Sequence, residues 1–244
     1  MKERSLTSYY DEVALKGLQL AQADAERGAL DPQRLMKIRD AVSEFTNNIS
    51  EQEDRPLPKA NSTTDVEATS AVETVAEDAP SEHLPILSKD ELPPGWQGEH
   101  PVLCVARRTL LDEAAAIMLG QLSTAHGLAA RVEAAEALAT ANIFRLATTG
   151  VAIVCLVYLD ASGAAHMRYS VRRLRRKLPT ATIILGCWMR DMDPAALERL
   201  REGAKADLAA SSVGEALKLC MEATGLVGHS LTTTLDGLST TTAA

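Results

Sequence analysis

Aromatic residues are scarce in this chain, because its 244 residues include only two Phe, two Trp and four Tyr. A hydrophobic core must therefore be built mainly from Ala, Leu, Val and Ile. The longest unbroken apolar run, VAIVCLVYL at 151–159, has nine residues, whereas a helix that spans a bilayer needs roughly 20. The first residues, MKERSLTSYYDE, contain no apolar stretch of the signal-peptide kind. We therefore expect a soluble cytoplasmic protein.

Motifs for disulfide, metal, phosphate and catalytic chemistry are also missing. The cysteines are far apart and form no C-x-x-C pair, so we expect four reduced core thiols: Cys104, Cys155, Cys187 and Cys220. Neither G-x-G-x-x-G nor G-x-x-x-x-G-K, the loops that cradle phosphates, is present. No nucleophile is paired with a base. The sequence thus predicts no catalytic residue, no metal site and no cofactor.

Negative charge is concentrated in one segment. Residues 51–99 hold 12 acidic and 3 basic residues, a net charge of −9, and the rest of the chain carries +1. The acidic segment is rich in Ser, Thr, Pro and Ala and has no periodicity, so residues 51–98 are expected to be a disordered linker. The Thr-rich stretch 226–244 is expected to be a disordered tail. Trp96 is expected to pack against the edge of the domain that follows the linker.

The first 50 residues predict a helical hairpin. Ser8 and Asp11 have the spacing of a capping box, Gly28 is placed to end this first helix, and a second helix begins at Asp31. Apolar residues then follow a 3-4-3-4 spacing along one face: Leu35, Ile38, Val42, Phe45 and Ile49. This face predicts packing within the hairpin or on a neighbouring part of the chain, with a homodimer through the hairpin as the alternative.

Residues 99–225 alternate between strands and helices. Strands are expected at 102–106, 128–133, 151–159, 182–189 and 207–210, and helices at 110–125, 136–146, 165–178, 194–204 and 212–223. Because the run at 151–159 has no polar alternation, it predicts a strand that is buried on both faces. Five such units predict an α/β domain with a five-stranded, doubly wound parallel sheet of flavodoxin-like type.

Ligands of doubly wound sheets bind at the carboxyl ends of the strands. The loops at that edge supply the candidate ligand-binding residues, which are Arg107, Arg108, Thr109, Tyr158, Ser162, His166 and Trp188. The two arginines favour a small anionic molecule or a protein segment. Thr109 and Asp112 have capping-box spacing, which satisfies the free N–H groups of the following helix internally.

A strongly basic helix is predicted at 165–178. Met167, Val171, Leu174 and Leu178 form the stripe that docks on the sheet. The remaining positions carry the candidate partner-binding residues Arg168, Arg172, Arg173, Arg175, Arg176 and Lys177. A solvated face is one interpretation; an acidic partner, such as the chain's own linker or anionic lipid head groups, is the other. Nucleic acid is disfavoured, because no stacking aromatic residues are interleaved with the arginines.

Two resemblances add to this interpretation. The run VLCVARRTLLDEAAAIMLGQLSTAHGLAARV, continuing to TIILGCW, resembles the cobalamin-binding type of flavodoxin-like domain. The family's D-x-H-x-x-G loop is replaced here by RRTLLD, so the cobalt-coordinating histidine is missing, and its G-G is only half kept at Gly186 and Cys187. The resemblance implies the fold, in a degenerate version that has lost cobalamin.

The segments KERSLTSYYDEVALKGLQLAQADAERGALD, RLMKIRDAVSE, LDEAAAIML and RYSVRRLRRKLP resemble the cytoplasmic C-terminal region of autoinducer-2 exporter (PerM-like) permeases. This resemblance implies a bacterial regulatory domain that associates with a membrane transporter at the inner face of the membrane. We therefore expect a non-enzymatic accessory domain of a permease. The alternatives are a stand-alone corrinoid or nucleotide sensor and, less favoured, a cryptic enzyme.

Overall fold

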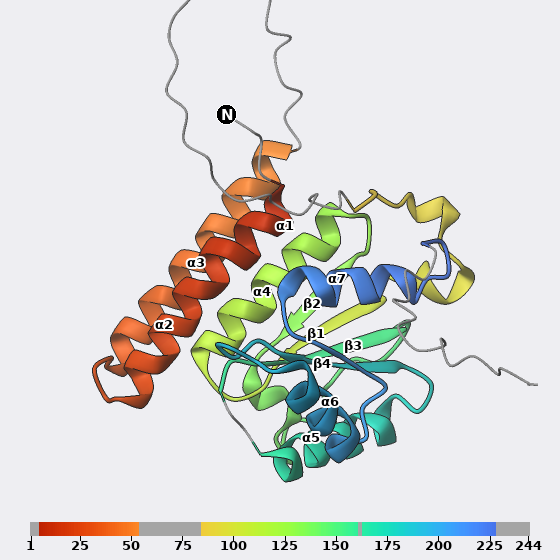
Figure 1. Cartoon of the computed structure of the whole chain (residues 1–244). Coiled ribbons are helices and arrows are strands. Elements are labelled where there is room, and N and C mark those ends of the chain that lie inside the picture. Colours follow the sequence, from red (N-terminus) through yellow and green to blue (C-terminus); the bar gives the residue numbers. More distant parts are fainter. Residues whose placement is uncertain (1–4, 54–83, 161–162, 228–244) are drawn as a thin grey trace, which may run out of the picture.

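A computed structural model describes residues 5–53, 84–160 and 163–227 of the chain. Its centre is a five-stranded, fully parallel sheet (Figure 1), with the order β2-β1-β3-β4-β5. The strands are β1 (Val102–Ala106), β2 (Ala130–Glu133), β3 (Ile153–Tyr158), β4 (Thr182–Cys187) and β5 (Leu208–Ala210). This order is that of flavodoxin-like sheets, so the predicted fold class is confirmed.

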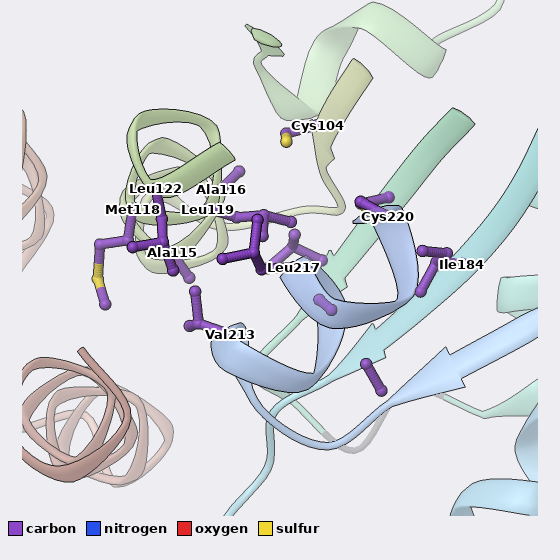
Figure 2. Packing of buried hydrophobic residues seen from close by; sticks show 14 of the residues in the cluster. Cys104, Ala115, Ala116, Met118, Leu119, Leu122, Ile184, Val213, Leu217 and Cys220 are labelled. Atoms are coloured by element: carbon purple, nitrogen blue, oxygen red, sulfur yellow. The ribbon is translucent and has the colours of Figure 1, made fainter. Parts of the chain in front are cut away.

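Helices cover both faces of the sheet, as right-handed crossovers require. One face carries α4 (Leu110–Ala125) and α7 (Val213–Glu222), and the other carries α5 (Ala164–Lys177), α6 (Pro194–Ala204) and the short 3-10 helix η4 (Ala135–Leu138). Figure 2 shows side chains of α4 and α7, among them Leu119 and Leu217, meeting on the first face. Because β1 and β3 lie between two apolar layers, every one of their residues is buried.

The N-terminal hairpin forms an additional layer outside α4 and α7 (Figure 1). Its first arm is one continuous helical stretch and its second arm is α3. These segments are α1 (Leu6–Tyr9), the π-helical turn η1 (Tyr10–Ala14), α2 (Leu15–Glu26) and α3 (Pro32–Glu53). Leu35, Ile38 and Val42 of the predicted seam pack against the core on the α4 side. The hairpin therefore packs these three residues of its seam on the α/β domain, while Phe45 is 40% exposed beside Tyr9.

Polar contacts also join the hairpin to the rest of the chain. The Tyr10 hydroxyl donates to Gln121 Oε1 at 2.9 Å, and Arg39 pairs with Glu113 at 3.1 Å. The predicted capping box of Ser8 and Asp11 is wrong, because Ser5 is the N-cap and its Oγ accepts from the Ser8 N–H. Asp11 instead caps α7, more than 200 residues away in sequence.

The part of the connection from residue 84 onward is folded, although we expected the linker to extend to residue 98. It contains the 3-10 helices η2 (Lys89–Glu91) and η3 (Pro94–Trp96), and it buries Leu92 and Trp96 in the core. The predicted packing of Trp96 on the domain is confirmed. The remaining linker residues 54–83 and the tail residues 228–244 lie outside the described residues.

The helix predicted at 136–146 is wrong, since only η4 and a series of turns occur there. The Asn142 side chain donates to the Glu136 carbonyl at 3.1 Å, and Arg131 donates to the Ala147 carbonyl at 2.6 Å. The local bond from Asn142 is of the kind that competes with helix formation. In the part of the chain that the structure covers, no helix has the length and apolar character to cross a bilayer.

Candidate functional site

Two adjoining hollows lie where α2 passes over the carboxyl ends of the strands. One, of about 300 Å³, lies against the β1–α4 loop and includes Arg108, Thr109 and Asp160. The other, of about 370 Å³, lies against the β4–α6 loop and includes Leu159 and Met189. Gln22 and Glu26 of α2 line both hollows. The site therefore combines the edge expected for this fold with a wall supplied by the hairpin.

Asp112 holds the loop residues Arg108 and Thr109, which line the first hollow. Its Oδ2 accepts from the backbone N–H groups of Arg108 and Thr109 at 3.0 and 2.9 Å, and its Oδ1 accepts from the Leu159 N–H at 2.8 Å. The Thr109 hydroxyl accepts from the Asp112 N–H in return, so the predicted capping box is confirmed. Burial raises the pKa of the Asp112 carboxyl above its ordinary value, although these hydrogen bonds oppose the shift. The carboxylate holds the loops after β1 and β3 together.

Gln22 is a buried polar group of both hollows that lacks one of its hydrogen-bond partners. Its side chain is 8% exposed, and its Nε2 donates to Glu26 Oε1 at 3.0 Å. Its Oε1 is buried and accepts no hydrogen bond from any residue that the structure describes. A buried carbonyl oxygen without a donor is costly, by about 1–3 kcal/mol, so it marks a place where a donor from a ligand fits.

Five of the seven predicted site residues divide between the two sides of the sheet. Arg108 and Thr109 line the first hollow. The Arg107 guanidinium lies 5.9 Å from the centre of the Tyr158 ring, which faces the α5 side and is fully buried; burial raises the pKa of Tyr158. Trp188 is fully buried on the hairpin side, and its indole ring lies against Gly186.

The other two predicted residues do not join the hollows. His166 is exposed in the first turn of α5, and Ser162 lies outside the described residues. Sequence reasoning missed Gln22 and Glu26, which contribute the hairpin wall. With Gln19, they stand at positions i, i+3 and i+7 of one helix and form a polar stripe. That stripe was visible in the sequence, but the edge that it faces was not.

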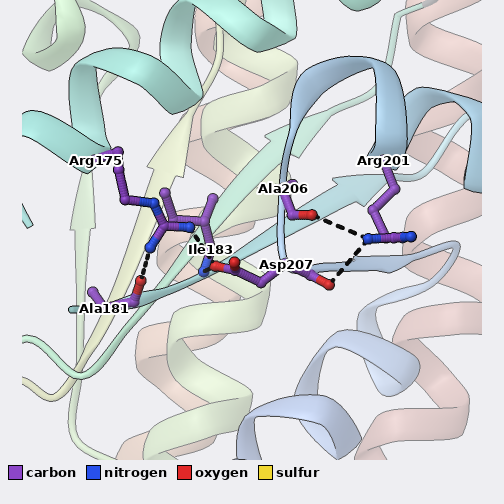
Figure 3. Close-up of polar contacts among 6 residues, drawn as sticks. All are labelled: Arg175, Ala181, Ile183, Arg201, Ala206 and Asp207. Carbon is purple, nitrogen blue, oxygen red and sulfur yellow. Dashed lines mark hydrogen bonds and ion pairs between the residues drawn. The ribbon is translucent and has the colours of Figure 1, made fainter. Parts of the chain in front are cut away.

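The basic side chains of α5 have two different surroundings: some bind neighbouring segments of the fold, and others line a hollow. Arg175 donates to the Ala181 carbonyl at 2.7 Å and pairs with Asp207 at 2.6 Å (Figure 3). Arg168 donates to the Gly203 carbonyl at 2.5 Å. Arg173, Arg176 and Lys177 instead line a third hollow, on the outer side of α5. Arg172 is exposed on the same helix. The basic face thus has a structural part and a part that is open to solvent.

The side chains that the structure describes form no cluster suited to binding a metal ion. Across residues 5–53, 84–160 and 163–227, no group of three or more His, Cys, Asp or Glu side chains is arranged to hold a metal ion. The four cysteines are buried and unbridged, as predicted, and Cys155 Sγ lies 3.7 Å from Cys220 Sγ.

Comparisons with solved structures find chains of similar fold, and one of them is described below. No protein-family model matches the chain, and no curated protein matches it either. A solved structure described as a novel cobalamin-binding protein from Desulfitobacterium hafniense DCB-2 is similar over 89% of this chain and 81% of that chain. The identity is 10% and the TM-score is 0.42. At this level we draw nothing from the likeness about ligand or function.

Proposed function

We propose that the chain is a non-enzymatic regulatory domain that binds a small molecule between α2 and the carboxyl edge of the sheet. The observation that supports this most directly is the buried, unsatisfied Oε1 of Gln22, which lines both hollows. Hollows of this size fall at the lower end of the range for small-molecule sites. They also lie where ligands of doubly wound sheets bind.

The lining specifies a ligand with mixed polarity. Gln22 Oε1 requires a hydrogen-bond donor, Glu26 and Asp160 favour one, and Arg108 attracts an anionic group. Leu159, Met189 and neighbouring apolar groups line the second hollow. A small metabolite with a donor group, an anionic group and a short apolar part suits these walls.

Binding rather than catalysis is favoured by the state of the titratable groups. Asp112 uses its oxygens to hold three backbone N–H groups, and burial raises the pKa of its carboxyl. Burial also raises the pKa of the Cys187 thiol, to about 12, which keeps the thiol protonated at neutral pH. These groups hold the fold together instead of supplying a base or a nucleophile.

The hairpin links ligand binding at the proposed site to a surface that a partner can contact. Gln22 and Glu26 belong to the same helical arm as Asp11, which is bonded to α7. A ligand that contacts Gln22 would therefore change how firmly this arm is held on the domain. From the resemblance to permease extensions, we propose a membrane transporter as the partner that reads this change.

Native mass spectrometry of the protein purified from its own cells tests the proposal, together with an absorbance scan and a thermal shift screen of small metabolites. We expect a bound small mass, or a metabolite that raises Tm. The Gln22→Leu variant should lose this response, whereas Gln33→Leu, an exposed change in the hairpin, should keep it. A clean apo mass without any thermal shift would refute ligand binding and favour a protein-interaction domain. Corrin absorbance would identify a cobalamin sensor instead.

A further inference from the structure

A third hollow, of about 330 Å³, lies between α5 and the turns that follow η4, away from the carboxyl edge. Two exposed aromatic residues line it: Phe144, which is 76% exposed, and Tyr169, which is 54% exposed. Single exposed apolar side chains are ordinary, but two exposed aromatic rings that line the same hollow form a local patch. Their convergence on one hollow requires an explanation other than core packing.

Three cations share this hollow. Lys177 Nζ lies 5.1 Å from the centre of the Phe144 ring, and Arg173 Cζ lies 5.3 Å from the centre of the Tyr169 ring. Arg173 also donates to Thr140 Oγ1 at 2.9 Å, which fixes its guanidinium beside the ring. Arg176 completes the set. Because α5 contains no acidic residue, these cations have no anionic partner on their own helix.

Nucleic acid was disfavoured above for want of stacking aromatic residues among the arginines, but Tyr169 stands between Arg168 and Arg172, and the fold brings Phe144 beside them. In sequence, Phe144 stands about 30 residues from the basic run, in a segment expected to be helical. The turns after η4 bring it to the cations, and Tyr169 lies one helical turn before Arg173. Aromatic faces beside Arg and Lys are the combination that holds unpaired bases and their phosphates.

We propose that this hollow binds a planar base that carries a phosphate, either as a free nucleotide or as one unit of a single strand. The base stacks on the ring of Phe144, the more exposed of the two, and the phosphate lies at Arg173, Arg176 and Lys177. An acidic peptide would use the charges but not the rings. Anionic lipid also attracts cations beside an exposed aromatic ring, so vesicles of anionic lipid are included in the test as an outcome that overturns the proposal.

Fluorescence titration of the full chain tests the proposal with five probes: ATP, a labelled oligo(U) 12-mer, adenosine, inorganic pyrophosphate and vesicles of anionic lipid. We expect ATP or the 12-mer to bind, and adenosine and pyrophosphate to bind at least tenfold more weakly. Tight binding of the 12-mer alone identifies a single strand as the source, and comparable binding of ATP identifies the free nucleotide. Either outcome supports the site.

Matched variants locate the binding. Phe144→Ala should weaken binding about tenfold, within the range that base stacking on an aromatic ring supports. Arg176→Gln should weaken it similarly, whereas Arg172→Gln, on the same helix but outside the hollow, should have at most a small effect. If pyrophosphate binds as tightly as ATP, or if vesicles of anionic lipid bind and the nucleotides do not, the proposal is wrong. The Gln22→Leu variant should bind the nucleotide normally, which separates this site from the carboxyl edge.

Discussion

At the scale of single residues, Gly127 shows how a backbone position enforces one side chain. Its φ is +85°, and a Cβ built there would lie 1.9 Å from the Leu87 carbonyl oxygen. Gly127 ends α4, where the Leu128 N–H donates to the Ser123 carbonyl at 2.9 Å, as in a Schellman motif. The segment from residue 84 crosses this helix end closely, so both the left-handed conformation and the contact require glycine.

We predict that Gly127→Ala lowers the free energy of unfolding by at least about 2 kcal/mol, because it combines strain at positive φ with a clash against backbone. Urea unfolding followed by circular dichroism measures this. The control Gly17→Ala lies inside α2 with open space around the added methyl group, and it should raise stability by about 0.5–1 kcal/mol. Equal effects of the two changes would contradict the assignment.

The buried thiols give a second prediction at this scale. Burial raises the pKa of Cys104; a hydrogen bond with Cys220 and burial both raise that of Cys155; and burial raises that of Cys187 to about 12. Because the thiolate is the reactive form, the folded protein at pH 8 should react with Ellman's reagent only as fast as it unfolds. Stopped-flow labelling at increasing urea checks this. Fast labelling of the native protein would show that the thiols are accessible.

At the scale of elements, the bond between the hairpin and α7 depends on one carboxylate. Asp11 Oδ1 accepts from the Val213 N–H at 2.9 Å, and its Oδ2 accepts from the Ser212 hydroxyl at 3.0 Å and the Gly214 N–H at 3.1 Å. The carboxylate thus caps the positive end of a helix that is remote in sequence. Gly214 allows this approach, because a Cβ there would lie 2.6 Å from Asp11 Oδ2.

We predict that Asp11→Ala destabilises the protein by about 1–3 kcal/mol, since it leaves the first N–H groups of α7 without this cap. Asp24→Ala, which removes a surface carboxylate from the same arm, should cost at most about 1 kcal/mol. Hydrogen exchange should show lower protection throughout η1 and the first turn of α7. In a double-mutant cycle, Gly214→Ala should cost less in the Asp11→Ala background, and strictly additive effects would argue against the contact.

At the scale of the whole molecule, the hairpin and the sheet share one core. Tyr10, Leu15 and Leu18 belong to the same buried cluster as Leu111 and Met118 of α4. The ion pair of Arg39 with Glu113 joins α3 to α4 as well. Removing the hairpin would expose this side of the α/β domain, so both parts should unfold together.

The pH dependence of stability follows from the buried carboxyl groups in this interface. Burial raises the pKa of Asp11 in the folded protein, so the folded chain binds a proton there at a pH where the unfolded chain has released it. The contribution of Asp11 to stability therefore rises as pH falls through the folded pKa toward the ordinary value of 3.8, and it is lost as pH increases.

We predict that lowering the pH from 8 to 5 shifts the difference in unfolding free energy between wild type and Asp11→Asn in favour of wild type. Urea titrations of both proteins at several pH values measure this difference. Asp24→Asn, with the same loss of charge on the surface, serves as the control. A shift in the opposite direction would mean that the hydrogen bonds to α7, which lower the pKa, outweigh burial.

The sequence by itself determined the α/β layout of this chain. The uninterrupted apolar run at 151–159 predicted β3, and the spacing of Met167, Val171, Leu174 and Leu178 predicted which side of α5 is buried. Thr109 and Asp112 predicted their capping box. These features could be predicted because periodicity and capping depend on residues a few positions apart, whose geometry the helix or strand itself fixes.

Only the tertiary structure decided where the hairpin lies and which residues meet at the candidate sites. Asp11 has the spacing of a local cap, yet its partners are in α7, and Gln22 faces loops that follow it by more than 80 residues. Phe144 reaches the cations of α5 because the expected helix at 136–146 gives way to turns. Contacts of this kind depend on the packing of whole layers, and no periodicity along a single segment encodes them.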